Sequence, residues 1–339
     1  MQKGMILTMK NKLFLGLDGG GTYTRVAIAD THGHLLCCIE QKGTASIYKD
    51  PDAKNNVQSA IYEAIRAANC DIGDIAAVAA GIAGLDSDDD MGWAQELTKI
   101  GELTASQMHV NDAVIAHCGA FRSKPGVIAI SGTGSITFGI NESGKHIRNY
   151  DFDHYAFTAA RHIAQNVVYK IIAGETDATD SGIIEQALLH FGVANVYELA
   201  ALGAGGFAKT GNATGNETAV IDRNKLFGDF TPIVTNCAIY GSNLAAQVCE
   251  KAAADIVTGI RLVGSLFESD EVRAALIGSV ANSACIFSCI DRELRKSANK
   301  AYILQKPEFP PVLGAVIMAT EYSGIEANSE FLDNLAAEL

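Results

Sequence analysis

The chain lacks the long apolar runs and the leader segment that membrane and secreted proteins need. No apolar run approaches the roughly 18–20 residues of a membrane-spanning helix, and the 312–319 stretch is short and contains Gly314. Residues 1–12 have neither an apolar core of roughly 7–15 residues nor an A-x-A-like cleavage site. Eight cysteines occur without a CxxC pair, which argues against a disulfide framework. We therefore expect a soluble protein of the cytoplasm that does not bind membranes.

Positive charge is also scarce. Lys and Arg total 26 against 39 Asp and Glu, which gives a formal net charge of −13 and a pI near 5.0. Such a surface repels phosphate backbones, so we expect no nucleic-acid partner. The length of 339 residues, with 48% hydrophobic and 19% charged residues, indicates two domains, each with its own core.

The first part of the chain has the pattern of a mixed α/β unit. Three short apolar segments separated by turns predict an antiparallel meander, and helices and strands alternate after it. The expected strands are 13–17, 25–29, 35–39, 75–80 and 108–110, and the expected helices are 52–68, 93–100 and 113–121.

The same pattern begins again at Gly126, which indicates a weak internal duplication. The second part is expected to be mostly helical over 154–268 and to return to a strand and a helix afterwards. The expected elements are strands 127–130, 136–140, 145–148 and 274–280 and a helix at 283–296. We place the domains at 1–121 and 122–324, with a helix at about 325–339 that packs back on the first domain.

A glycine-rich turn follows the first strand and predicts a phosphate site. Its glycines let backbone N–H groups approach a phosphate, its threonine hydroxyls add donors, and an aspartate at the strand end can hold Mg²⁺. A simple hairpin turn is the alternative interpretation. The residues are Asp18, Gly19, Gly20, Gly21, Thr22 and Thr24.

A second Gly/Thr turn stands at the equivalent place in the duplicated part. It comprises Gly132, Thr133, Gly134 and Ser135. Two such loops, one in each half, could hold a polyphosphate together. Neither loop contains Lys and no G-x-x-x-x-G-K-[ST] motif occurs, so the chain is not a P-loop protein and a metal would neutralise the phosphates.

Asp112 stands where the strand 108–110 meets the following helix. A carboxylate at this junction could accept a proton from a substrate hydroxyl during phosphoryl transfer. A helix N-cap is the alternative role for an aspartate at this position. The two phosphate loops favour the role of general base.

These segments resemble the BadF/BadG/BcrA/BcrD ATPase family, within the superfamily of sugar kinases, Hsp70 and actin. The resemblance rests on DGGGTYT, VAAGIAGL, VNDA, GVIAISGTGS and a late IGSV, and it extends from Leu13 to about Ala319. It implies an α/β fold of two ribonuclease-H-like (actin-like ATPase) domains, with a cleft between them that closes on ATP and Mg²⁺. Family members are often dimers, so a homodimer is expected.

The resemblance also implies roles for single residues. Asp18 would position the metal, the two loops would hold phosphates, and Asp112 would be the base. Gly278 and Ser279 would lie near the adenosine, and Asn111, beside the base, would contact the sugar. Because the best-understood relatives are N-acetylglucosamine and glucosamine kinases, the expected acceptor is an amino sugar such as these or a muramic-acid relative.

The acceptor side departs from the family pattern. Ser46 stands where the family tends to have a sugar-binding Asn, and residues 148–161 lack the usual glycines and Asp-Glu pair. Asp153 or Asp151 could replace the lost acidic residue. A regulatory ATPase without sugar kinase activity, or a degenerate relative with a structural role, are therefore alternatives to the kinase. The cysteine motif of the dehydratase-activating branch after Gly81, and the zinc cluster of the ROK repressors, are absent from the sequence.

Overall fold

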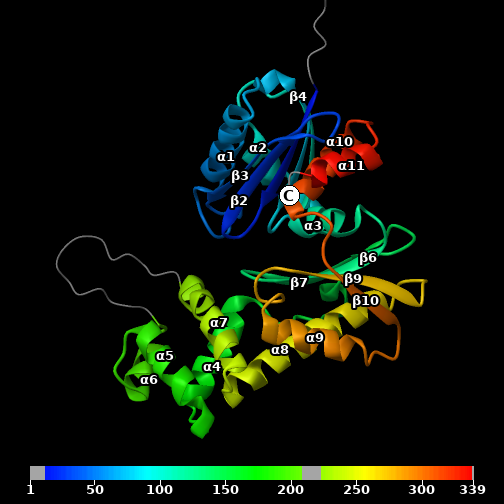
Figure 1. The fold of residues 1–339 in the computed structure, drawn as a ribbon. Helices are drawn as coiled ribbons and strands as arrows, with labels where there is room; N and C mark the ends of the chain where they lie inside the picture. Colours follow the sequence, from blue (N-terminus) through cyan, green and yellow to red (C-terminus); the bar gives the residue numbers. More distant parts are fainter. Residues whose placement is uncertain (1–11, 208–222, 338–339) are drawn as a thin grey trace, which may run out of the picture. The chain divides into compact units, whose positions relative to one another are not determined.

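The computed structural model describes residues 12–207 and 223–337 and divides the chain into two compact units. Unit 1 consists of Met1–Lys124 and Lys306–Leu339, and unit 2 of Pro125–Gln305. Each unit is built on a five-stranded sheet with helices packed against it (Figure 1). The two units are described separately below.

The sheet of unit 1 has the order β3-β2-β1-β4-β5. Strands β1, β2 and β3 form the expected antiparallel meander, and β4 and β5 continue it in parallel with β1. The bounds are β1 Leu13–Gly19, β2 Tyr23–Ala29, β3 Leu35–Lys42, β4 Ile75–Ile82 and β5 Ser106–Asn111.

Helices cover both faces of this sheet (Figure 1). Because side chains alternate along a strand, Leu13, Leu15 and Leu17 of β1 join one core cluster and Phe14 joins the other. The first cluster includes α1 (Ala53–Ala67) and α2 (Met91–Thr98). The second includes α3 (Asp112–Phe121), α10 (Pro311–Tyr322) and α11 (Ser329–Ala336). Strand β1 is thus buried on both sides, which fixes the residues at its end.

Helix α10 belongs to unit 1, so the expected domain end at residue 324 is corrected to Gln305. The reason is close packing that the local sequence does not reveal. A Cβ at Gly314 would lie 2.1 Å from the carbonyl oxygen of Ile115 in α3. A Cβ at Gly16 in β1 would lie 2.5 Å from the backbone nitrogen of Val316. These glycines let α10 contact both β1 and α3 at backbone distance.

Replacing Gly314 by Val should therefore destabilise unit 1 strongly. The added side chain would overlap the backbone of α3, and overpacking of this kind costs about 1–3 kcal/mol or more. The measurement is the thermal or urea midpoint of unfolding. Gly228→Ala is the control, because a Cβ there meets nothing within 4 Å. Equal midpoints for the two variants would contradict the packing described.

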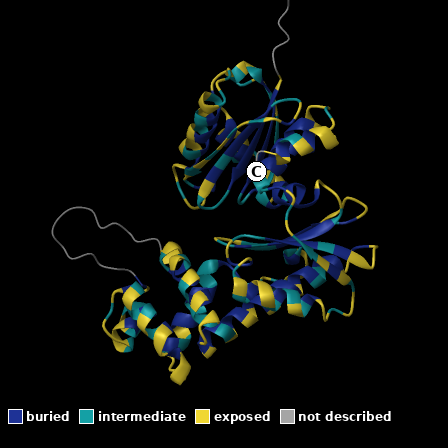
Figure 2. Cartoon of the chain, in the orientation of Figure 1, coloured by how far each residue is buried: buried dark blue, intermediate teal, exposed yellow. Residues whose placement is uncertain are grey.

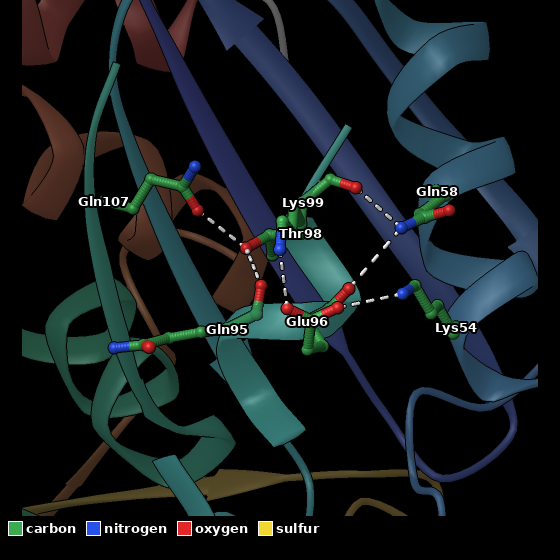
Figure 3. A network of polar contacts seen from close by, with 7 residues as sticks. All are labelled: Lys54, Gln58, Gln95, Glu96, Thr98, Lys99 and Gln107. Atoms are coloured by element: carbon green, nitrogen blue, oxygen red, sulfur yellow. Dashed lines mark hydrogen bonds and ion pairs between the residues drawn. The ribbon is translucent and has the colours of Figure 1, made fainter. Parts of the chain in front are cut away.

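A polar network joins α1, α2 and β5 (Figure 3). The Gln58 side chain donates to the Lys99 carbonyl at 2.7 Å, which ties α1 to the end of α2. The fully buried Thr98 hydroxyl lies 2.7 Å from both Gln107 Oε1 and His109 Nε2 of β5. Buried polar groups satisfied in this way resist displacement, so β5 is held against α2 at Gln107 and His109.

The sheet of unit 2 repeats that order as β10-β9-β6-β7-β8. Its first three strands in sequence form an antiparallel meander, and β9 and β10 are parallel to β6. The bounds are β6 Gly126–Ser131, β7 Ser135–Ile140, β8 His146–Arg148, β9 Glu271–Ile277 and β10 Ala301–Gln305. The expected duplication and fold class are confirmed, and β10 is an additional strand.

Six helices of unit 2 pack around one core, which Figure 2 shows as buried inner faces. Part of this core is an aromatic group in which the rings of Phe191, Phe207 and Phe227 lie 4.8–5.6 Å apart. The helices are α4 Ala160–Ile172, α5 Ser181–Phe191, α6 Val196–Ala204, α7 Arg223–Ile239, α8 Asn243–Gly264 and α9 Ala284–Leu294.

Within residues 12–207 and 223–337, no single helix has the length and apolar composition of a membrane span. One bent pair, Ala178–Phe191 with Val196–Ala204, reaches that composition only when its two helices are taken together.

Candidate functional site

The carboxyl ends of β1, β4 and β5 form one edge of the unit 1 sheet. Asp18 of β1 pairs in register with Gly81 of β4, and Ile82 pairs with Asn111 at the end of β5. Asp112 follows Asn111 as the first residue of α3. Since two strand spacings separate β1 from β5, about 10 Å in all, the structure brings Asp18 and Asp112 to the same edge with β4 between them.

Asp18 is buried and lies against a cation. Its side chain accepts a hydrogen bond from Arg25 Nη1 at 3.3 Å, and Arg25 Nε donates to Glu40 at 2.7 Å. Burial raises the pKa of Asp18 above its usual range, although Arg25 acts in the opposite direction. Arg25 and Glu40 are absent from the residues predicted above. The register of the two hairpins could have identified them, because Arg25 pairs with Asp18 across β1 and β2 and with Glu40 across β2 and β3.

Asp112 is not the cap of α3. The N-cap is Asn111, whose side-chain oxygen accepts from the Ala113 N–H at 2.9 Å, so the alternative interpretation of Asp112 is wrong. Burial raises the pKa of Asp112 to about 7, and the negative charges of Asp18 and Asp86 add to the rise. A partly buried carboxyl that is half protonated near neutral pH is suited to accepting and releasing a proton.

The amide of Asn111 is engaged at both ends. Its Nδ2 group donates to Asp86 at 2.9 Å and to the Leu85 carbonyl at 3.3 Å, while its oxygen caps α3. These bonds hold the start of α3 against the loop after β4 and thereby orient Asp112. Contact of Asn111 with a sugar stays a prediction.

The glycine turn after β1 is backed by the loop 43–46. Ala45 N–H donates to the Gly20 carbonyl at 3.2 Å, and Gly43 N–H donates to the Thr22 carbonyl at 3.0 Å. Thr24 is fully buried and its hydroxyl donates to the Gly43 carbonyl at 2.9 Å, so the prediction that this hydroxyl donates to a phosphate is wrong. Gly20, Gly21 and Thr22 are partly exposed, and the Gly20 N–H donates to the Tyr23 carbonyl at 3.1 Å within the turn.

Ser46 lies in the backing loop and is only 4% exposed. Its backbone N–H is held by the Thr44 hydroxyl at 3.0 Å. The neighbouring Ala45 N–H bonds the Gly20 carbonyl, so Ser46 lies next to the residue that contacts the glycine turn. Its contact with a sugar stays a prediction.

The second loop lies in unit 2, at the end of β6. Gly132 N–H donates to the Gly134 carbonyl at 2.9 Å, and Thr133 and Gly134 are exposed. Parallel pairing of β6 with β9 brings Gly278 to this loop, where Val280 N–H donates to the Ser131 carbonyl at 3.1 Å. The expected strand 274–280 ends earlier, at Ile277, because the chain turns at Gly278.

Gly278 is required by this turn. Its φ is +95°, and a Cβ would lie 2.3 Å from the Ser131 carbonyl oxygen. We predict that Gly278→Ala displaces the second loop and lowers ATP affinity about tenfold or more. Isothermal titration with ATP is the measurement, and Gly144→Ala, at an open turn with positive φ, is the matched control. Unchanged affinity in Gly278→Ala would contradict a role for this turn in nucleotide binding.

The segment 149–162 wraps the second loop. Ser131 Oγ donates to the Thr158 carbonyl at 2.6 Å, and Arg161 Nη1 donates to the Thr133 carbonyl at 3.1 Å. Tyr155 and Phe157 are 59% and 69% exposed beside this loop. Sequence reasoning did not single out these rings, although the aromatic run 150–157 is visible in the chain.

The two aspartates of this segment differ in their surroundings. Asp151 pairs with Arg148, with Nη2 3.2 Å from Oδ1. Asp153 is exposed, at a φ of 53°, just after a short 3-10 helix. Of the two, Asp153 is the carboxylate that lies open to a ligand, and its contact with a sugar stays a prediction.

The chain is similar to proteins named as amino-sugar kinases. An N-acetylmuramic acid/N-acetylglucosamine kinase of Clostridium acetobutylicum is 24% identical over 91% of this chain and 98% of that protein. An N-acetyl-D-glucosamine kinase of Dictyostelium discoideum is 30% identical over 40% of this chain and 46% of its own length. The crystal structure of a candidate N-acetylglucosamine kinase from Chromobacterium violaceum has a TM-score of 0.69 at 18% identity and covers 91% of this chain and 99% of its own. A family model matches residues 15–319, and the chain belongs to the BadF/BadG/BcrA/BcrD ATPase family.

Proposed function

We propose that the protein is an ATP- and Mg²⁺-dependent kinase that phosphorylates a hydroxyl of an amino sugar such as N-acetylglucosamine, glucosamine or an N-acetylmuramic acid relative. The observation that carries the proposal is the placement of Asp112 across β4 from Asp18, at the strand end where the first glycine turn also lies. The named activities of the relatives in Clostridium and Dictyostelium support the acceptor class.

Asp112 acts as the general base in this proposal. Its pKa of about 7 makes its conjugate base strong enough to accept the proton of a sugar hydroxyl as that oxygen attacks the γ-phosphorus. The Asn111 cap holds the start of α3 and with it Asp112, and such positioning contributes much of the rate enhancement in phosphoryl transfer.

Asp18 and the surrounding carboxylates fit a magnesium ion. Carboxylate oxygens are the ligands that Mg²⁺ prefers. Burial is the main cause of the raised pKa values of Asp18 and Asp112, and a bound cation would favour their ionised forms. Among the described residues no group of three or more His, Cys, Asp or Glu could hold a metal ion, and in this proposal phosphate oxygens and water would supply its other ligands. When bound, the ion neutralises phosphate charge.

Each of the two loops is assigned contacts with the nucleotide. In unit 1 the contacts come from Gly19, Gly20, Gly21 and Thr22, and the buried Thr24 braces the turn from behind. In unit 2 they come from Gly132, Thr133, Gly134 and Ser135, with Gly278 and Ser279 beside the adenosine. Backbone N–H groups in such turns bind phosphate oxygens without a lysine.

Sugar recognition is assigned to Ser46, Asn111 and Asp153, joined by the exposed rings of Tyr155 and Phe157. An aromatic ring packs well against the apolar face of a pyranose. The two rings could therefore bind the sugar in place of the family residues that this chain lacks.

The protein is assigned to the cytoplasm, where ATP is available, and all eight of its cysteines are free. We also assign it a homodimeric state, to be tested by sedimentation.

The test is a coupled assay of ADP release with Mg²⁺ and ATP against amino sugars, N-acetylated sugars, muramic-acid derivatives and plain hexoses. The proposal expects ADP release that requires an amino sugar. A regulatory ATPase is the second candidate, because residues 148–161 lack the glycines and the Asp-Glu pair of the family. ADP release that is the same without any sugar would favour that candidate and contradict the kinase.

A further inference from the structure

The start of α4 is fastened to the second loop by hydrogen bonds from two consecutive residues. The Ala160 N–H donates to the Gly132 carbonyl at 2.8 Å, and Arg161 Nη1 donates to the Thr133 carbonyl at 3.1 Å. The Thr231 hydroxyl of α7 donates to the Ala160 carbonyl at 2.5 Å and anchors this end of the helix from behind. The guanidinium of Arg161 is therefore held against the loop that is assigned to phosphates.

Most of the hydrogen-bonding capacity of the Arg161 side chain is unused. A guanidinium carries several N–H donors in a fixed fork, and the bond to Thr133 occupies one of them. Among residues 12–207 and 223–337, the Arg161 side chain has no second hydrogen-bond partner and no carboxylate partner. The residue is also partly exposed. Arg161 thus brings to the second loop a positive charge that no described carboxylate neutralises.

The cation beside the first glycine turn is in a different state. Arg25 follows that turn, but its Nη1 lies 3.3 Å from Asp18 and its Nη2 lies 2.6 Å from Glu40, so two carboxylates neutralise it. Neither loop itself contains Lys or Arg. The planar fork of a guanidinium matches the spacing of phosphate oxygens, and its bonds to them are charge-assisted. Arg161 therefore has the free charge and the geometry that phosphate binding requires.

We propose that Arg161 binds the phosphate groups of ATP and supplies the positive charge that both loops lack. This inference rests on the nucleotide-binding function proposed for the second loop. One N–H of the fork stays on the Thr133 carbonyl and orients the guanidinium, while its remaining N–H groups donate to phosphate oxygens. Because the start of α4 is anchored before the ligand arrives, little ordering of the chain is needed on binding.

The experiment titrates Arg161→Gln and the wild type with ATP and with adenosine, in Mg²⁺ and without any sugar. We expect the Kd for ATP to rise about tenfold in Arg161→Gln, the scale of one hydrogen bond to a charged group. The Kd for adenosine should stay within about twofold, because adenosine has no phosphate. Equal losses for the two ligands would mean that Arg161 only shapes the loop, and would overturn the proposal.

Two further variants separate the charge at this position from charge in general. Arg161→Lys keeps the charge but loses the fork, so its Kd for ATP should lie between those of the wild type and Arg161→Gln. Arg295→Gln is the matched control, because it removes the same charge from an exposed side chain of unit 2 that pairs with Asp291. It should bind ATP as the wild type does. A lysine variant no better than Arg161→Gln, or an equal loss in Arg295→Gln, would overturn the proposal.

These readouts are binding constants and do not depend on sugar turnover. A wild type that binds ATP but transfers no phosphate to a sugar would contradict the kinase and would leave the expected difference between Arg161→Gln and the wild type in place. ATP binding by Arg161→Gln equal to that of the wild type would overturn this inference, while sugar phosphorylation by the wild type would still support the kinase.

Discussion

Replacing Asp112 by Asn is expected to reduce sugar phosphorylation by about 10²–10⁴-fold in kcat, the range that a general base contributes. Asn keeps the size of the side chain but cannot accept the hydroxyl proton. ATP affinity should stay within about twofold, because the phosphate loops are unchanged. Steady-state turnover and ATP titration are the two measurements. Asp89→Asn is the matched control, since it makes the same exchange at an exposed carboxylate of unit 1.

The same substitution should stabilise the nucleotide-free protein at alkaline pH. Because the pKa of Asp112 is raised to about 7, ionising this carboxyl costs folding free energy. The cost is absent at pH values below the ordinary pKa of an aspartate. It grows as the pH rises and is complete above pH 7. Asp112→Asn removes it, so the melting temperature should rise relative to wild type at pH 8 and change little at pH 4, both in EDTA. Two results together would contradict a buried general base at Asp112: turnover equal to that of the wild type, and a melting temperature that depends on pH as in the wild type.

Asp18→Asn is the second substitution with a large expected effect. Loss of this carboxylate should lower kcat/KM by about 10²–10³-fold, as for other groups that stabilise developing charge, and should raise the Mg²⁺ concentration needed for half-maximal rate. The measurement is a Mg²⁺ titration of turnover at saturating ATP.

Glu40→Gln serves as the control for Asp18. Glu40 pairs with the same guanidinium of Arg25 but lies on β3, away from the end of β1. It should therefore leave the Mg²⁺ requirement nearly unchanged. Equal effects of the two substitutions would mean that Asp18 acts only through Arg25 and would contradict its assignment to the metal.

The meander and the alternating elements after it could be predicted because their apolar residues follow the periods of strand and helix. Strand β1 illustrates this, since its unbroken apolar segment is buried on both faces. The duplication was also visible, because each half begins with an apolar strand and a Gly/Thr turn. Both signals are local in the chain.

The features that escaped prediction depend on distant contacts or weak local signals. Helix α10 follows unit 2 in sequence but packs on unit 1 through Gly314 and Gly16. Strand β10 is a five-residue edge strand with Ala301 and Ile303 exposed, so its apolar pattern is short and incomplete.

The site shows the same division. Each Gly/Thr turn could be predicted from its own glycines, and the position of Asp112 at the start of a helix from its place after a strand. The pairing of Asp18 with Arg25 requires the hairpin register, and the contact of Gly278 with Ser131 requires strands β6 and β9 to be neighbours. The position of the Tyr155 and Phe157 rings near the second loop could not be predicted, because it depends on hydrogen bonds that hold their segment against that loop.

The central claim is that the γ-phosphoryl group reaches a sugar. The most direct test incubates the protein with Mg²⁺, γ-³²P-labelled ATP and N-acetylglucosamine, glucosamine or N-acetylmuramic acid, and then separates the products. The account predicts label on at least one of these sugars, and no label on sugar with Asp112→Asn. Label found only in inorganic phosphate, in equal amount with and without sugar, would contradict it.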